Sequence, residues 1–316
     1  MEDFREYYKK CVLCPRECNV NRLEGEVGIC AESDTMRVAW VGLHKGEEPV
    51  ISINKGSGTL FFTGCSLQCP HCQNYQISHP YFKNGVEISV EQLVELFFEL
   101  ERADSDNINL VTANHFIPSV GEALKIAKEK GLKLPVVYNS SGYEKVESLK
   151  IIEPYIDTFL IDLKTLNTEV SKKFCNTNGY AEHATALLKY LYEKQQKSFF
   201  SDGIFKGTIV RHLLFPNEEE ATKEVIRYFG NNLKNKFWLS FMFQFVYPHE
   251  KNQVMTEPKV YDELIELLDE LEIEEGFVQE AGDDSVWVPN FERENPFPSE
   301  FSHSLKSFLK LKEINR

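Results

Sequence analysis

The feature that most constrains the fold is a regular alternation of short β-rich apolar runs and helical patterns after residue 59. This alternation is typical of βα units, whose strands form a parallel sheet covered by the helices. We expect six strands, at residues 60–63, 108–112, 136–139, 159–163, 208–213 and 238–243. Six units are too few for a closed eight-stranded barrel, so the predicted fold is α/β, a partial (β/α)6-type barrel.

Helices are predicted at residues 90–102, 119–130, 185–193, 218–229 and 259–271. The first of these has the clearest local signals. Ser89, with Gln92 three residues later, predicts a capping box at its start. Its apolar residues recur at helical spacing and predict one face packed on the sheet: Leu93, Val94, Leu96, Phe97 and Leu100.

The chain divides into three parts by its composition. Residues 1–55 are turn-rich and contain four cysteines, so we expect a small cysteine-rich, metal-binding appendage there. Residues 56–250 contain the predicted barrel. Residues 251–316 contain one amphipathic helix, a short seventh strand near residues 277–279 and an irregular, aromatic extension.

Charge and cysteine content exclude several classes of function. The net charge of −14, from 49 acidic and 35 basic residues, opposes binding to nucleic acid or to anionic membranes. No run approaches the roughly 20 apolar residues that span a bilayer, so we expect a cytoplasmic protein. Seven of the eight cysteines lie within the first 72 residues, which indicates metal binding rather than disulfides.

Three cysteines follow the first predicted strand with the spacing C-x3-C-x2-C: Cys65, Cys69 and Cys72. In an α/β barrel, this end of the strands is where active sites form. Three thiolates can hold a four-iron cluster and leave one iron free for another ligand. The alternative is a zinc site that takes its fourth ligand from His71 or from a distant cysteine.

This motif, at this place in an α/β chain, resembles the radical S-adenosylmethionine superfamily. Further segments resemble its branch similar to pyruvate formate-lyase activating enzyme: residues 11–16, 46–49, 56–62, 72–78, 139–144 and 211–213. The resemblance implies a [4Fe-4S] cluster and S-adenosylmethionine as cofactors. It also implies reductive cleavage to a 5'-deoxyadenosyl radical that abstracts hydrogen, with electrons from a donor such as flavodoxin or ferredoxin.

The same resemblance implies roles at two predicted strand ends. Asp162 and Lys164 match a D-x-K stretch beside the methionine end of the cofactor, where the lysine pairs with the carboxylate. Strand alternation puts both side chains on one face. Arg211 is similar to an arginine near the cofactor. An ordinary surface ion pair at Asp162 and Lys164, and a salt bridge between strands at Arg211, are the alternatives.

The sequence departs from the activating enzymes in two loops. Where these usually carry Gly-Gly-Glu, residues 112–116 read Thr112-Ala113-Asn114-His115-Phe116, which leaves backbone carbonyls of Thr112 to Asn114 to meet the amino group. His115 is a candidate contact to cofactor or substrate, or a structural histidine. Asn139 stands where an acidic residue lies near a monovalent cation.

Four further cysteines, Cys11, Cys14, Cys18 and Cys30, have the spacing C-x2-C-x3-C-x11-C. Such a set suits zinc or a second iron-sulfur cluster, and either would stabilise a segment too short to build its own core. The alternative is a set of reduced thiols without metal. We expect Cys175, which stands alone, to be a buried free thiol.

The resemblance therefore implies a radical enzyme. Its reaction is the activation of a partner protein through a glycyl radical, or the modification of a peptide or small molecule. Two other classes stay open at this point: a zinc-stabilised, non-catalytic binding protein and an electron-transfer protein.

Overall fold

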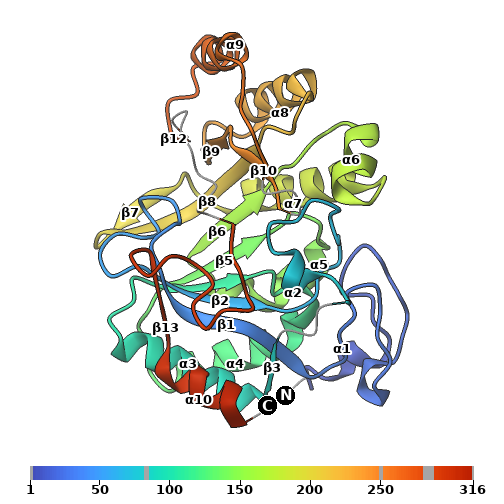
Figure 1. Ribbon diagram of the computed structural model, residues 1–316, viewed down its shortest axis with the longest axis vertical. Helices are drawn as coiled ribbons and strands as arrows, with labels where there is room; N and C mark the ends of the chain where they lie inside the picture. Colours follow the sequence, from blue (N-terminus) through green and yellow to red (C-terminus); the bar gives the residue numbers. More distant parts are fainter. Residues whose placement is uncertain (1–2, 82–84, 249–251, 280–287, 315–316) are drawn as a thin grey trace.

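The computed structural model describes residues 3–81, 85–248, 252–279 and 288–314. One curved, open sheet forms its centre, with strand order β12-β9-β8-β6-β5-β4-β2-β1-β13 (Figure 1). The parallel strands are β2 (Ser57–Phe62), β4 (Ile108–Val111), β5 (Val136–Ser140), β6 (Thr158–Asp162), β8 (Ile204–Leu213), β9 (Trp238–Met242) and β12 (Gly276–Val278). The sheet stays open, which confirms the predicted α/β partial barrel.

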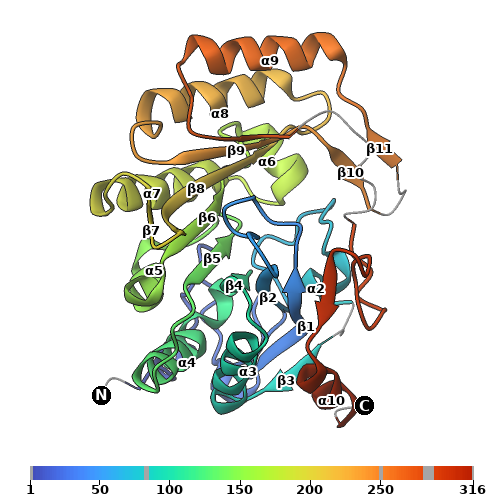
Figure 2. The ribbon, with the colours of Figure 1, turned by 90° about the vertical axis from the view of Figure 1, so that its left-hand side faces the viewer.

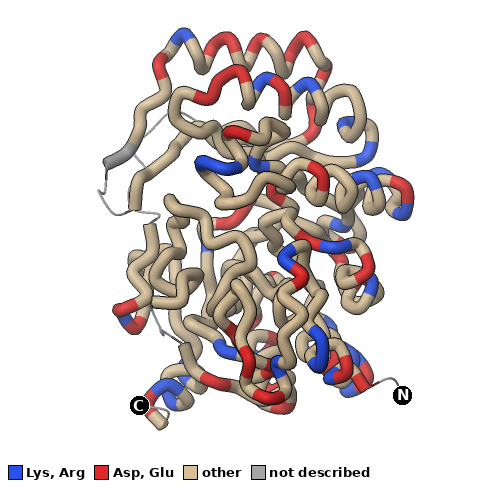
Figure 3. Tube along the Cα trace, turned by 90° about the vertical axis from the view of Figure 1, so that its right-hand side faces the viewer, with Lys and Arg blue, Asp and Glu red and all other residues tan. Residues whose placement is uncertain are grey.

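Helices follow the parallel strands and lie outside the curved sheet, as Figure 2 shows. They are α3 (Val90–Arg102), α4 (Ile117–Glu129), α5 (Val146–Ile152), α6 (Thr168–Cys175), α7 (Tyr180–Lys194), α8 (Glu219–Asn232) and α9 (Pro258–Glu270). Helices α5 and α6 were not predicted, because seven or eight residues give too few turns for a clear period. Acidic and basic residues are spread over the outer helices α8 and α9 (Figure 3).

Helix α3 begins as its sequence predicts. The Gln92 amide donates to Ser89 Oγ at 3.2 Å, and the Ser89 amide donates to Gln92 Oε1 at 2.8 Å. This capping box satisfies amides that the first turn would leave unpaired. The five predicted apolar residues of α3 are all buried.

Both ends of the chain add antiparallel strands to the same sheet. Strand β1 (Met36–His44) pairs with β2 and with β13 (Ser302–Ser304), and β3 (Val86–Ile88) also pairs with β1. The Trp40 indole N–H donates to Ser304 Oγ at 2.8 Å. The last helix, α10 (Lys306–Ile314), buries Phe308 against the main core. Sequence separation hides these pairings, and we did not predict them.

Shorter elements complete the fold. They are α1 (Glu6–Lys9), α2 (Tyr75–Ser78), the hairpin partner β7 (Phe199–Ser201) beside β8, and the separate pair β10 (Phe245–Tyr247) and β11 (Asn252–Val254). Single 3-10 turns span Arg22–Glu24, Asn114–Phe116 and Glu153–Tyr155. None of the helices in the described ranges has the length and hydrophobicity that crossing a membrane requires.

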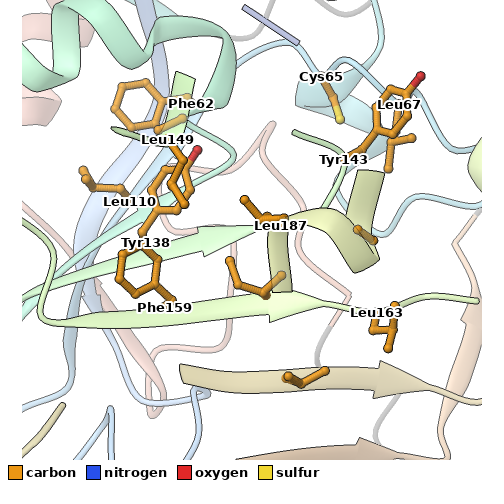
Figure 4. Close-up of a cluster of buried hydrophobic side chains, with 14 of the residues drawn as sticks. Phe62, Cys65, Leu67, Leu110, Tyr138, Tyr143, Leu149, Phe159, Leu163 and Leu187 are labelled. Carbon is orange, nitrogen blue, oxygen red and sulfur yellow. The ribbon is translucent and has the colours of Figure 1, made fainter. Parts of the chain in front are cut away.

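The main core lies between the parallel strands and their helices. Figure 4 shows part of it, in which Leu110 and Phe159 from two strands belong to the same cluster as Leu163. Cys65 and Leu67, from the loop after β2, belong to this cluster too. The cysteine loop is therefore anchored in the core of the barrel.

Candidate active site

A cavity of about 700 Å³ opens at the carboxyl ends of the parallel strands. Six of these strands each contribute a lining residue: Phe61, Val111, Asn139, Asp162, Arg211 and Met242. This is the end of the strands at which open α/β sheets and barrels bind ligands. The volume lies within the range of about 300–1,000 Å³ that is usual for small-molecule sites.

Cys65, Cys69 and Cys72 line this cavity. The loop that holds them turns tightly: the Cys72 amide donates to the Cys69 carbonyl at 3.2 Å, and Gln68 adopts a left-handed backbone conformation. Burial, together with the neighbouring thiols of Cys69 and Cys72, raises the pKa of the Cys65 thiol to about 12. The three thiols are thus close electrostatic neighbours at one wall.

Cys175, the last residue of α6, is fully buried as expected, but it also lies against the site. Its thiol is hydrogen-bonded to the thiol of Cys69, a contact that also raises the pKa of Cys69. Sequence spacing gave no signal for this contact, because the two residues are brought together only by the packing of α6.

Asp162 and Lys164 both line the cavity, as the alternation along β6 predicts. The Lys164 ammonium donates to Asp162 Oδ2 at 2.6 Å. Burial by itself would lower the pKa of Lys164, but the Asp162 carboxylate raises it well above its usual range. Lys164 therefore stays a cation at the cavity wall, where it can receive a ligand carboxylate.

Arg211 lines the cavity, but carboxylates already engage its guanidinium. Its Nε and Nη2 donate to the two carboxylate oxygens of Glu48 at 2.6 Å each. Nη2 also pairs with Glu47, and Nη1 donates to Asn139 Oδ1 at 3.3 Å. Two carboxylates share one cation, which leaves a net negative charge beside the cavity. Residues 46–49, which contain Glu47 and Glu48, are one of the segments that resemble the activating-enzyme branch. We did not predict that they pair with Arg211.

The predicted residues after β4 separate into two groups. Thr112 lines the cavity, whereas Asn114 and His115 do not. Asn114 Nδ2 donates to Ser66 Oγ at 3.1 Å. His115 Nε2 donates to the Thr63 carbonyl at 2.7 Å, and burial lowers the pKa of its imidazole to about 3. Both side chains support the cysteine loop from behind.

One wall of the cavity is aromatic, which the sequence did not indicate. Phe174 and Phe215 stack with ring centroids 4.3 Å apart, and both line the cavity with Phe245. His71, between two of the cysteines, meets Tyr247 edge-on at 4.9 Å. These rings offer an apolar surface for a planar group such as a nucleobase.

Cys11, Cys14, Cys18 and Cys30 do not line the cavity. They lie in the amino-terminal segment, and none of the eight cysteines forms a disulfide. Within the described ranges, no three His, Cys, Asp or Glu side chains are arranged to hold a single metal ion.

The family model of the Radical SAM superfamily matches residues 59–229, which is more than half of the chain. The chain belongs to the radical SAM superfamily. A [4Fe-4S] cluster and S-adenosylmethionine are therefore its cofactors, and the protein is an enzyme of radical SAM type. This membership excludes the two non-enzymatic classes that the sequence left open.

An uncharacterized protein of Methanocaldococcus jannaschii is 28% identical over 251 residues, covering 78% of this chain and 68% of that protein. A second protein of the same organism, provisionally named a glycyl-radical enzyme activating enzyme, is 29% identical over 114 residues. That match covers 35% of this chain and 44% of the relative. The solved structure of methylornithine synthase has 13% identity and a TM-score of 0.47, covering 79% of this chain and 78% of that one.

Proposed function

We propose that Cys65, Cys69 and Cys72 hold the [4Fe-4S] cluster and that this enzyme acts on a polypeptide, as an activase of a glycyl-radical enzyme. The observation that carries the first part is the meeting of three thiols at the wall of the strand-end cavity. Three thiolates supply the donor set of a cluster that keeps one iron free. When bound, this cluster supplies the electron that cleaves S-adenosylmethionine reductively to a hydrogen-abstracting 5'-deoxyadenosyl radical.

Different residues of the cavity bind different groups of S-adenosylmethionine. Lys164 is the cation that receives the carboxylate of the methionine moiety, because its pair with Asp162 keeps it charged and aimed along the wall. Thr112 offers its backbone to the amino group. Thr112 adopts a left-handed conformation with φ of 58°, which favours glycine, the residue that activating enzymes usually carry in this loop.

The aromatic wall keeps water away from the reacting atoms. Phe174, Phe215 and Phe245 contact one another at this wall and present only carbon and hydrogen to the cavity. Excluding water and other hydrogen sources prevents side reactions of a radical.

The electron reaches the cluster from outside the chain. Radical SAM enzymes take electrons from a reductant, and we propose a flavodoxin or a ferredoxin as the donor. The eight free cysteines fit a reducing compartment, and we propose the cytoplasm.

Two observations support a polypeptide substrate. The relative provisionally named a glycyl-radical enzyme activating enzyme matches 114 residues of this chain. The cavity of about 700 Å³ also has room for a cofactor and part of a second molecule. A peptide-modifying enzyme with an auxiliary metal site is the second candidate, because the amino-terminal cysteines offer such a site.

Anaerobic reconstitution tests the cluster assignment. We expect the reduced protein to convert S-adenosylmethionine to 5'-deoxyadenosine and methionine. Cys65→Ala, Cys69→Ala and Cys72→Ala should each abolish this product and reduce the [4Fe-4S] signal, while Cys175→Ala should keep the cluster. Formation of 5'-deoxyadenosine at the wild-type rate by any of the first three variants would refute the assignment.

The substrate class needs a separate experiment. Peptides with a central glycine, in which deuterium replaces both hydrogens on Cα, are incubated with the reduced enzyme and S-adenosylmethionine. An activase should transfer deuterium into 5'-deoxyadenosine and leave a glycyl-radical signal on the peptide. Rapid cleavage of S-adenosylmethionine with no deuterium transfer from a library of such peptides would exclude the activase and leave the radical reaction intact.

A further inference from the structure

The amino-terminal segment folds around its four cysteines rather than around an apolar core. Its buried apolar cluster contains only Tyr8, Cys11 and Leu13, with three partly buried neighbours. Cys14 and Cys30 are also buried. So small a core contributes little stability by itself, and short segments of this kind usually rely on metals or disulfides. Disulfides do not connect these cysteines.

Backbone contacts bring the four thiols together. The Cys11 amide donates to the Val20 carbonyl, and the Asn19 amide returns a bond to the Cys11 carbonyl, both at 2.9 Å, so Cys11 lies beside the turn that contains Cys18. Gly28 makes room for the Cys18 thiol, because a Cβ at this glycine would lie 2.8 Å from Cys18 Sγ. The thiols of Cys30, Cys11 and Cys18 are all electrostatic neighbours of Cys14.

Backbone amides point at three of these sulfur atoms. The Ile29 amide donates to Cys18 Sγ at 3.3 Å. The amides two residues after Cys14 and Cys30, those of Arg16 and Glu32, donate to the respective sulfurs. Hydrogen bonds of this kind favour the thiolate, whereas burial raises the pKa of the Cys14 thiol to about 12 and that of Cys30 to about 11. Thiolates are the form in which cysteine binds metal.

The surroundings of the Arg22 side chain are the observation that most favours a metal centre here. Its side chain is fully buried, and its Nη1 lies 3.9 Å from Cys11 Sγ. Its other hydrogen bonds go to the carbonyl oxygens of Ser33 and His115, and it forms no ion pair with a carboxylate in the part of the chain that is described. A buried guanidinium requires a negative partner. The guanidinium also lies over the rings of Tyr8, at 4.6 Å, and Phe116, at 5.5 Å, which are neutral. Cys11 and Cys30 are the neighbouring groups that become anions when they bind a metal.

We propose that Cys11, Cys14, Cys18 and Cys30 bind a second metal centre as thiolates, with Arg22 as its counter-charge. Four thiolates suit a zinc ion or an iron-sulfur cluster, and with either one the centre has a net negative charge that Arg22 partly neutralises. Metal binding releases the thiol protons and draws the four sulfurs onto the centre. The site is closed, because cysteine supplies every ligand, so its role is structural.

Arg16 connects this centre to the loop of Cys65, Cys69 and Cys72. Placed between Cys14 and Cys18, it donates from Nε to the Ser66 carbonyl at 2.8 Å and from Nη2 to the Leu67 carbonyl at 3.3 Å. Gln68 returns a hydrogen bond to the carbonyl of Ile29, next to Cys30. Arg16 is therefore a positioning residue for the cluster loop, a conclusion that rests on the proposed function.

Metal analysis of the full-length chain tests the second centre. In a Cys65→Ser, Cys69→Ser, Cys72→Ser triple variant, reconstituted with zinc or with iron and sulfide, we expect about one zinc or about four irons per chain. Adding Cys11→Ser and Cys30→Ser should remove this metal. A triple variant with native circular dichroism and no stoichiometric metal would overturn the proposal, whichever metal is supplied.

Thiol alkylation provides the same test on the wild-type protein, so it does not depend on a variant that folds. With metal bound, iodoacetamide should spare the four amino-terminal cysteines, and a chelator should expose them. Equal alkylation before and after chelation would overturn the proposal. If Cys65, Cys69 and Cys72 hold no cluster while the second centre persists, the proposed function fails and the second metal site stands.

Arg16→Gln tests the connection between the two sites. The variant should keep its amino-terminal metal, but its reduced cluster should show an altered electron paramagnetic resonance spectrum and roughly tenfold faster loss of iron to a chelator. Arg5→Gln is the matched control, because Arg5 lies in the same segment and its exposed side chain pairs with Asp34. A wild-type spectrum and wild-type iron loss in Arg16→Gln would show that Arg16 does not position the cluster loop.

Discussion

At the scale of single residues, Lys164 is the side chain whose role the structure makes most testable. Its ammonium lies at the cavity wall and forms an ion pair with Asp162. Among the described residues it pairs with no other carboxylate. A charge-assisted hydrogen bond contributes about 1.5–3 kcal/mol, so Lys164→Met should weaken S-adenosylmethionine binding roughly 10- to 100-fold. Anaerobic titration calorimetry on the cluster-loaded protein measures this affinity.

Lys172→Met is the matched control for this prediction. Lys172 also pairs with a carboxylate, that of Glu169 at 2.6 Å, but it lies on the outer surface of α6 and does not line the cavity. Its replacement should leave the affinity unchanged. Equal affinities for the two variants would show that Lys164 does not meet the cofactor.

Glu144 should make stability depend on pH in an unusual direction. Burial raises the pKa of its carboxyl from 4.5 to about 7, although hydrogen bonds from Ser140 and Tyr138 oppose the rise. At pH values between these two pKa values, Glu144 keeps its proton in the folded protein and loses it in the unfolded chain. The free energy of unfolding should therefore fall as pH rises, by about 2 kcal/mol between pH values of roughly 5.5 and 7.5.

Glu144→Gln isolates this contribution, because glutamine cannot ionise and fits the same space. Urea unfolding at both pH values should show a smaller fall for the variant than for the wild type. The same fall in both proteins would assign the pH dependence to other groups.

Local signals in the sequence predicted part of the site. Asp162 is the last residue of β6 and Lys164 follows two residues later, so the period of two along the predicted strand placed them together. The contact between Arg22 and Cys11 joins residues 11 apart in the chain, and the pairing of Arg211 with Glu48 spans 163 residues. No local pattern contains such contacts, which explains why the carboxylates around Arg211 and the thiol contact of Cys175 were missed.

At the scale of elements, the start of α3 offers a clean measurement. Ser89 Oγ accepts from the Gln92 amide at 3.2 Å, and alanine would leave that amide without its side-chain acceptor. Ser89→Ala should lower the free energy of unfolding by about 1 kcal/mol, measured by urea unfolding. Ser201→Ala, in the edge strand β7, should change it by less than about 0.5 kcal/mol. Equal effects would mean that the cap contributes nothing specific.

The elements of this fold differ in how well their own residues predict them. Strands that are buried on both faces are continuous apolar runs, and all six predicted parallel strands are present. The short helices α2, α5 and α6 lack a sustained period, and β13 has only three residues. Such elements form because the surrounding structure pairs or packs them, so their own residues predict them poorly.

At the scale of the whole molecule, both ends of the chain should unfold together with the barrel. Strand β1 is hydrogen-bonded on one side to β2 and on the other to β13, so Gly42 faces both Thr59 and Ser304. Opening β1 would break both ladders and expose Trp40, which is 1% exposed. Residues 3–35 have no strand in this sheet and a small core of their own.

Hydrogen exchange followed by mass spectrometry distinguishes these parts. We expect the amides of β1 to exchange as slowly as those of β2 and β4, because the three strands open only when the sheet unfolds. The edge strand β7 should exchange faster and serves as the internal control. Chelation should speed exchange in residues 3–35 but not in β1. If β1 instead exchanged as fast as residues 3–35, the first 55 residues would be an independent appendage, and the sheet would owe its stability to the parallel strands alone.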